Sequence, residues 1–137
     1  MLDVNEGLVL VAAQSRGVHA LSPETLEAQW SAPVKGVSHV SRGVAGTYLA
    51  ISSLEGVVCL QTDGEERWRA QMNPGMLSKP VVVGETIFVA HSEDGLLALD
   101  ARTGEFLAGF DVGSGMTAPP TFDAEDRRLY ATSNRGR

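Results

Sequence analysis

Short apolar runs alternate with short polar turns along this chain, and one five-residue pattern recurs at a fixed distance. Each copy is a glycine followed by mostly apolar residues, and the copies lie at 17–21 (GVHAL), 56–60 (GVVCL) and 95–99 (GLLAL). Their glycines stand 39 residues apart, since 56 − 17 and 95 − 56 both equal 39. A period near 40 built from short apolar runs is typical of a protein whose repeated unit is one small sheet. The pattern therefore predicts a β-propeller.

A second apolar run precedes each glycine, and a short polar link joins the two. These runs lie at 8–12, 47–51 and 86–90, and a fourth copy at 128–131 leads to Gly136. Gly136 follows Gly95 by 41 residues, and the two extra residues fit the polar stretch 123–126, where an insertion costs little. A glycine with positive φ suits a tight turn. Each pair of runs is therefore predicted to form a β-hairpin.

The residues after each hairpin predict two further strands per unit. Turn residues lead to a strand that contains Trp30 in the first unit and Trp68 in the second. A last strand is expected after a loop, at 38–44, 80–83 and 119–122, where proline suits a strand start or an edge. Four short strands make a propeller blade. The predicted fold class is therefore all-β, a β-propeller of four-stranded antiparallel blades.

The repeats divide the whole chain, 1–137, into one partial propeller. The predicted repeats are approximately 1–37, 38–76, 77–115 and an incomplete 116–137, which gives about three to three and a half blades. An open arc leaves terminal strands unpaired. We therefore expect either a piece of a longer propeller or a ring that a partner completes.

The third unit carries the most complete repeat motif, SEDGLLALDARTGE at 92–105. It resembles the quinoprotein-like (PQQ-like) β-propeller repeat family, and the resemblance covers nearly the whole chain. In that family a tryptophan in the position of Trp30 and Trp68 docks between neighbouring blades. Ala108 stands in that position in the third unit, so the resemblance implies that one dock is weakened or filled differently.

Composition and charge narrow the choice of partners and of location. A formal net charge of −6 argues against nucleic acid as the main partner. No apolar run is long enough for a transmembrane helix, and the first residues lack the features of a signal peptide. The family resemblance nevertheless implies a periplasmic or cell-envelope location. A single cysteine, Cys59, excludes an internal disulfide and leaves the redox compartment open.

Two features have both a structural and a functional interpretation. Cys59 takes the place of Ala20 and Ala98 in the repeat, which favours a small buried core residue over a reactive thiol. Four arginines gather near the carboxyl end. They form either a solvated hairpin of mixed charge or a docking edge for an acidic partner. These arginines are Arg127, Arg128, Arg135 and Arg137.

The sequence provides no convincing catalytic or metal site. His19, His39 and His91 fall at different positions of the repeat, so they do not form a repeated ligand set. The adjacent carboxylates at 65–66 and 93–94 fall in predicted turns, where such groups are solvated. Asp94-Gly95 lacks the further acidic residues of a calcium loop, and no helix follows Gly113 and Gly115 to make a phosphate loop. We expect no catalytic, cofactor-binding or metal-binding residues, no cofactor and no enzymatic activity.

Three classes of function remain open. The first is a non-enzymatic scaffold for protein–protein interaction, similar to the propeller lipoprotein of the outer-membrane β-barrel assembly machine. The second is a fragment of a quinone-cofactor dehydrogenase, although the chain has neither a Cys-Cys pair nor a cluster of calcium ligands. The third is the sensory propeller of a signalling protein. For the first, we expect edges near 8–11 and 128–131 to pair with strands from a second copy, a partner chain or the rest of the same propeller.

Overall fold

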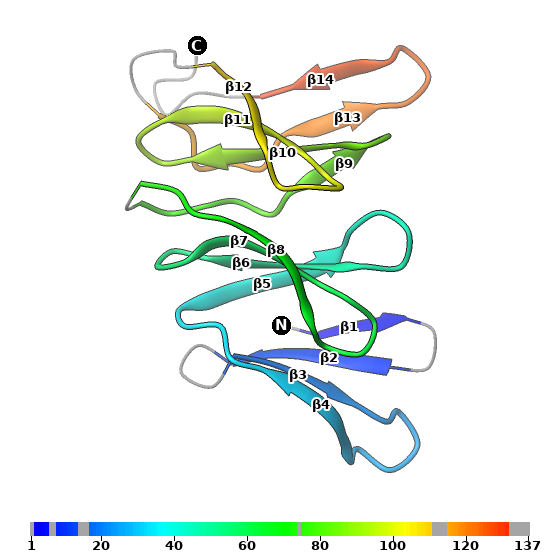
Figure 1. Ribbon diagram of the computed structural model, residues 1–137. Helices are drawn as coiled ribbons and strands as arrows, with labels where there is room; N and C mark the ends of the chain where they lie inside the picture. Colours follow the sequence, from blue (N-terminus) through cyan, green and yellow to red (C-terminus); the bar gives the residue numbers. More distant parts are fainter. Residues whose placement is uncertain (1, 6–7, 14–16, 74, 111–114, 132–137) are drawn as a thin grey trace.

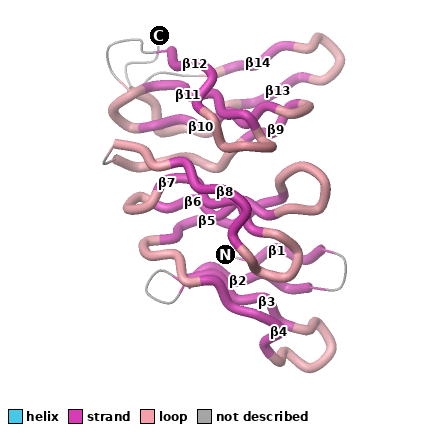
Figure 2. Tube along the Cα trace, viewed as in Figure 1, coloured by secondary structure: helices cyan, strands magenta, loops and turns pink. Residues whose placement is uncertain are grey.

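The computed structural model describes residues 2–5, 8–13, 17–73, 75–110 and 115–131. Within them every regular element is a β-strand and none is a helix (Figure 2). The strands, in chain order, are β1 (Leu2–Asn5), β2 (Leu8–Ala13), β3 (Gly17–Leu21), β4 (Ala28–Ala32), β5 (Val37–Arg42), β6 (Tyr48–Ser52), β7 (Gly56–Leu60), β8 (Glu66–Ala70), β9 (Val81–Val83), β10 (Thr86–His91), β11 (Gly95–Asp100), β12 (Phe106–Phe110), β13 (Thr121–Asp123) and β14 (Arg128–Tyr130).

The strands form successive antiparallel sheets, each of which is one blade. Blade 1 has the order β1-β2-β3-β4, blade 2 β5-β6-β7-β8 and blade 3 β9-β10-β11-β12, while β13 and β14 form the two-stranded blade 4. The blades follow one another from the blue to the red end of the chain (Figure 1). The predicted all-β, partial propeller of four-stranded antiparallel blades is thus confirmed.

Two strand assignments from the sequence are wrong in detail. The strands expected to close units, at 38–44, 80–83 and 119–122, are instead β5, β9 and β13, the first strands of the following sheets. The chain turns back between Arg42 and Tyr48, so β5 pairs antiparallel with β6, from Val37 opposite Ser52 to Arg42 opposite Tyr48. The segment 8–11 is also not an edge, because β1 of the same chain pairs with β2.

The core lies between blades, because each blade is apolar on both faces. Blades 1 and 2 enclose one cluster that includes Leu10, Val18, Tyr48 and Leu60. Blades 2 and 3 enclose a second that includes Ile51, Cys59, Ile87 and Leu99. In β6 and β7 every residue is buried, since this central pair has a neighbouring blade on each side. A blade therefore depends on its neighbours for the burial of its apolar surface.

The repeated glycines are required by a close approach between strands. Gly17 and Gly56 have φ of +92° and +86°, in the region where other residues are strained. A Cβ on Gly17 would collide with the carbonyl oxygen of Ala32, and one on Gly56 with that of Ala70. Gly95, with φ of +88°, repeats the turn in blade 3. The fourth copy, Gly136, lies outside the described residues.

Each tryptophan joins its own blade to a turn of the next blade. The indole Nε1 of Trp30 donates to the carbonyl oxygen of Thr62 at 2.8 Å, and that of Trp68 donates to Ala101 at 3.0 Å. A Cβ on Gly64 would lie 2.6 Å from the Trp30 ring, so glycine at this turn makes room for the indole. Trp68 is buried, as expected, whereas Trp30 is partly buried.

The third unit lacks this contact, as the sequence indicated. Cys59 pairs with Trp68 across β7 and β8, and at the same point of blade 3 Ala98 pairs with Ala108. Every residue of β12 is exposed. The outer strand of blade 3 therefore has no aromatic anchor of this kind.

His91 holds the hairpin of blade 3 against the loop that enters this blade. Its Nδ1 accepts the backbone N–H groups of Glu93 and Asp94 at 3.0 and 2.9 Å, and its Nε2 lies 2.8 Å from the carbonyl oxygen of Asn73. The proton must therefore sit on Nε2, which donates to Asn73. In blade 2, Ser52 makes the equivalent three bonds, to Leu54, Glu55 and Lys35. Both residues are fully buried, so this repeat position has a structural role.

Trp68→Ala is expected to lower the free energy of unfolding by about 3–5 kcal/mol, because it leaves a cavity between blades 2 and 3. Trp68→Phe keeps most of the apolar contact and loses one hydrogen bond, worth about 1 kcal/mol. Urea unfolding followed by circular dichroism measures both. Leu107→Ala, an exposed position, is the control and should change little. Equal stability of Trp68→Ala and the parent chain would contradict the proposed role of the dock.

His91→Phe is expected to destabilise the chain by about 2–4 kcal/mol, since it preserves a ring of similar size but loses three hydrogen bonds. His91→Asn, which keeps an acceptor for the two N–H groups, should recover part of that loss. Imidazole ¹⁵N chemical shifts provide a direct measurement of the tautomer. A proton found on Nδ1 would show that the hydrogen-bond assignment is wrong.

Candidate functional site: the blade 2–3 groove and the open face of blade 3

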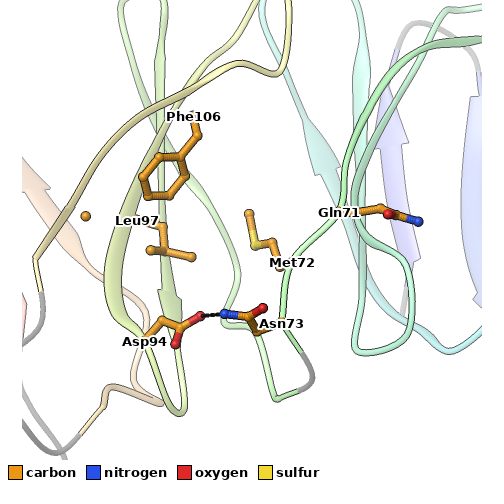
Figure 3. Close-up of a pocket in the computed structure, with 7 residues that line it drawn as sticks. Gln71, Met72, Asn73, Asp94, Leu97 and Phe106 are labelled. Carbon is orange, nitrogen blue, oxygen red and sulfur yellow. Dashed lines mark hydrogen bonds between the residues drawn. The ribbon is translucent and has the colours of Figure 1, made fainter.

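An open groove of about 470 Å³ lies between blades 2 and 3. We call it the blade 2–3 groove. One wall carries Phe106, Leu97 and Asp94 of blade 3, and Met72 and Asn73 lie on the opposite side (Figure 3). Gln71 and Gly109 complete the lining. The groove therefore combines apolar walls with one carboxylate.

The carboxylate is positioned by the connection that leads from blade 2 to blade 3. Asn73 Nδ2 donates to Asp94 Oδ2 at 3.0 Å (Figure 3). The Nδ1 atom of His91 lies 3.8 Å from the same oxygen, but this nitrogen already accepts two backbone N–H groups and carries no proton. Asp94 is 36% exposed and remains accessible from the groove.

The second candidate surface is the face of blade 3 that points away from blade 2. We call it the open face of blade 3. Phe88, Leu96, Ala98 and Ala108 line a hollow of about 230 Å³ there, together with Gly109 and Phe110. In the described part of the chain, β13 contacts β9 at the inner end of this sheet. None of the described elements covers the outer strand β12, and Phe110 is 63% exposed.

The corresponding face of blade 2 shows what the open face of blade 3 lacks. Leu96 pairs with Phe110 as Val57 pairs with Ala70. Val57 and Ala70 are buried against blade 3, whereas Phe110 has no such cover among the described residues. The hollow beside Ala108 occupies the position that Trp68 fills in blade 2. This face is thus an inter-blade surface whose outer strands are not covered by any described residue of blade 4.

A charged cluster occupies the junction of blades 1 and 2. Arg69 Nη1 lies 2.6 Å from Glu55 Oε1, and Arg69 Nη2 lies 2.7 Å from Glu66 Oε1. Burial disfavours the ionised form of Glu55, but hydrogen bonds from Arg69 and from the Lys35 backbone outweigh it and keep the pKa of Glu55 below its usual value. Hydrogen bonds to Glu66 and Glu55 raise the pKa of Arg69. All three charged side chains belong to blade 2, and the backbone N–H of Lys35 joins the cluster to the connection from blade 1.

The structure does not bring the three histidines together into a common site. His19 Nδ1 lies 2.8 Å from the hydroxyl of Ser31 in blade 1, and His91 belongs to the hairpin of blade 3. His39 is in blade 2, where burial, assisted by the charge of Lys79, lowers its pKa. Within the described ranges, no group of three or more His, Cys, Asp or Glu residues could hold a metal ion.

The other residues considered from the sequence do not form a common site either. Cys59 is fully buried, as expected of a core residue, and its burial raises the pKa of the thiol. Glu65 lies in the turn before β8, whereas Glu66 is its first residue. Arg127 lies in the turn before β14 and Arg128 is the first residue of that strand. Arg135, Arg137 and Gly113 lie outside the described residues. No helix of the described chain is long and apolar enough to cross a membrane.

The blade 2–3 groove was not predicted from the sequence, although the repeat contained a signal for it. Leu97 pairs with Gly109 at the point where Val58 pairs with Arg69. A change from arginine to glycine at an equivalent position removes a long side chain from the junction between blades. Aligning the fourth strands of the blades, β8 and β12, would have identified this difference.

Comparison with known proteins gives one family and several similar folds. The model of the family described as outer membrane protein assembly factor BamB matches residues 14–137. No curated protein matches the sequence. The computationally designed protein Ika4 is 14% identical, with a TM-score of 0.82 over 99% of this chain and 85% of its own.

Two natural proteins of solved structure contain the same arrangement of blades within longer chains. BamB from Moraxella catarrhalis is 20% identical, with a TM-score of 0.79 over 99% of this chain and 40% of its own. Quinohemoprotein alcohol dehydrogenase from Comamonas testosteroni is 19% identical, with a TM-score of 0.71 over 97% of this chain and 28% of its own. This chain therefore spans less than half the length of either natural protein. The repeats and the family match over 14–137 together show that the chain belongs to the BamB family of PQQ-like β-propellers.

Proposed function

We propose that this chain is a non-enzymatic β-propeller scaffold for protein–protein interaction, and that it is part of a larger or partner-completed propeller. The observation that carries the proposal is the open face of blade 3, where Phe88, Leu96 and Phe110 surround a hollow that is apolar. The corresponding faces of blades 1 and 2 are covered by the next blade along the chain. An exposed apolar patch of this kind marks an interaction site.

The edge of blade 4 supports the same function. In the described residues β14 pairs with β13 on one side only. The backbone donors and acceptors on its other side, which no described residue pairs with, can extend a sheet by strand addition. A β-hairpin that pairs with β14 would lie against the open face of blade 3, as blade 2 packs against blade 1 in the cluster that includes Val18, Tyr48 and Val58. One incoming hairpin would therefore both pair with the edge strand β14 and cover the open face of blade 3.

The family description, outer membrane protein assembly factor, favours an assembly role over catalysis. It also favours a place in the cell envelope. The alternative of a dehydrogenase fragment is supported by the similar fold of the quinohemoprotein enzyme, but fold alone does not transfer an activity. The described residues offer an apolar groove with a single carboxylate rather than a set of metal ligands. A sensory role would depend on an attached signalling module.

The proposed function predicts that the isolated chain associates through the open face of blade 3. Sedimentation velocity at tens of micromolar should show a species larger than a monomer. Phe110→Lys should shift it towards the monomer, because it places a charge in the apolar contact. Leu54→Lys is the matched control: Leu54 is 72% exposed but lies in a hairpin turn of blade 2. A stable monomer with strong amide-exchange protection in β14 would overturn the proposal.

The absence of dehydrogenase activity is a separate prediction. The chain is incubated with pyrroloquinoline quinone and calcium, desalted, and tested by absorption spectroscopy and a dye-linked alcohol assay. We expect neither retained cofactor nor turnover, because the sequence lacks the Cys-Cys pair of such enzymes. Stoichiometric retention together with turnover would favour the dehydrogenase alternative instead.

A further inference from the structure

The blade 2–3 groove and the charged cluster at the junction of blades 1 and 2 occupy the same place in the repeat. Glu55 precedes the hairpin glycine of blade 2 and Asp94 precedes that of blade 3. The carbonyl oxygen of Lys35 accepts from Ser52, and that of Asn73 accepts from His91 at the equivalent position. Leu60 pairs with Glu66 as Leu99 pairs with Phe106. The two junctions can therefore be compared residue by residue.

At the junction of blades 1 and 2 an internal arginine fills this place. The guanidinium of Arg69 contacts Glu55 at 2.6 Å and Glu66 at 2.7 and 3.1 Å. The other carboxylate oxygen of Glu55 accepts the backbone N–H of Lys35 at 2.7 Å. The chain thus shows how a guanidinium is held at this point between two blades.

At the junction of blades 2 and 3 the acid remains but the arginine is missing. Gly109 stands in the position of Arg69, and the vacated space is the groove of about 470 Å³. Asp94 is anchored by Asn73 at 3.0 Å, as Glu55 is anchored by Lys35. Among the described residues, no lysine or arginine lies within ion-pair distance of Asp94. The second acid, Glu66, is replaced by Phe106, which is 57% exposed.

We propose that the blade 2–3 groove binds an arginine side chain presented by a partner protein. The guanidinium pairs with Asp94 and lies against the ring of Phe106, while the methylene groups pack on Leu97 and Met72. Arginine fits this place because its planar cation both stacks on an aromatic ring and pairs with a carboxylate. The proposal rests on the proposed function, since it names a feature of the protein partner.

The test is an NMR titration of the ¹⁵N-labelled full chain with N-acetyl-arginine methylamide. We expect shifts of the Asn73 side-chain amide and of the backbone amides of Asp94 and Gly95, with a dissociation constant on the order of millimolar, as befits a small ligand. The citrulline derivative has the same shape without the charge and should bind about tenfold more weakly. Equal binding of the two derivatives, or shifts that spread over the whole surface, would show that the groove is not a cation site.

Variants separate the groove from general effects of charge. Asp94→Asn should weaken arginine binding about tenfold, whereas Glu93→Gln, the same loss of charge one residue away on an exposed side chain, should not. Gly109→Arg should abolish binding by filling the groove as Arg69 does. In β12 a Cβ at Gly109 meets the Phe106 ring at 3.1 Å, a side chain with room to move. Unchanged binding in Asp94→Asn would overturn the proposal, whether or not Gly109→Arg folds.

The outcomes for the groove and for the proposed function can be told apart. Phe110→Lys alters the open face of blade 3 and should leave arginine binding intact. If Phe110→Lys disperses the associated species but arginine does not bind, the groove assignment fails and the scaffold function stands. If arginine binds with the expected dependence on Asp94 while the parent chain is a stable monomer, the groove stands and association through the open face fails.

Discussion

The burial of apolar surface between adjacent blades is the interaction on which the rest of this structure depends. A single four-stranded sheet of this length is apolar on both faces and cannot shield either one alone. In blade 2 both faces are covered, and Leu49, Ile51, Val57 and Val58 are fully buried. Tertiary contacts between neighbouring repeats, rather than contacts within one repeat, therefore determine which residues are core and which are surface.

The same dependence explains why the functional candidates are found at junctions. The tryptophan of one blade, the glycine turn of the next and the buried Ser52 or His91 form a set of contacts that is repeated along the chain. Where the third unit has a smaller residue than the second, as at Ala108 and Gly109, a hollow or a groove results. Function in this scaffold is therefore expected where the repeat departs from its own pattern.

Both departures replace a large side chain of β8 by a small one in β12. The change from Trp68 to Ala108 leaves the open face of blade 3 apolar, and the change from Arg69 to Gly109 leaves Asp94 without an internal cation in the described chain. The first suits burial of an apolar partner surface and the second suits a basic side chain. Two neighbouring residues thus give the two sides of one strand different binding chemistry, because successive side chains point to opposite faces.

The 39-residue period by itself determined the strands, the hairpin turns and the blade architecture, since alternation and turn glycines are local properties of the chain. It also showed that Ala108 stands where the first two units have a tryptophan. Three features were decided only by the tertiary structure. The strand at 38–44 belongs to the sheet of blade 2, β1 pairs with the segment 8–11, and a groove lies beside Asp94. These features depend on which strand pairs with which and on what one blade presents to the next. A strand has the same local pattern at the end of one sheet as at the start of another, so only the packed structure distinguishes the two.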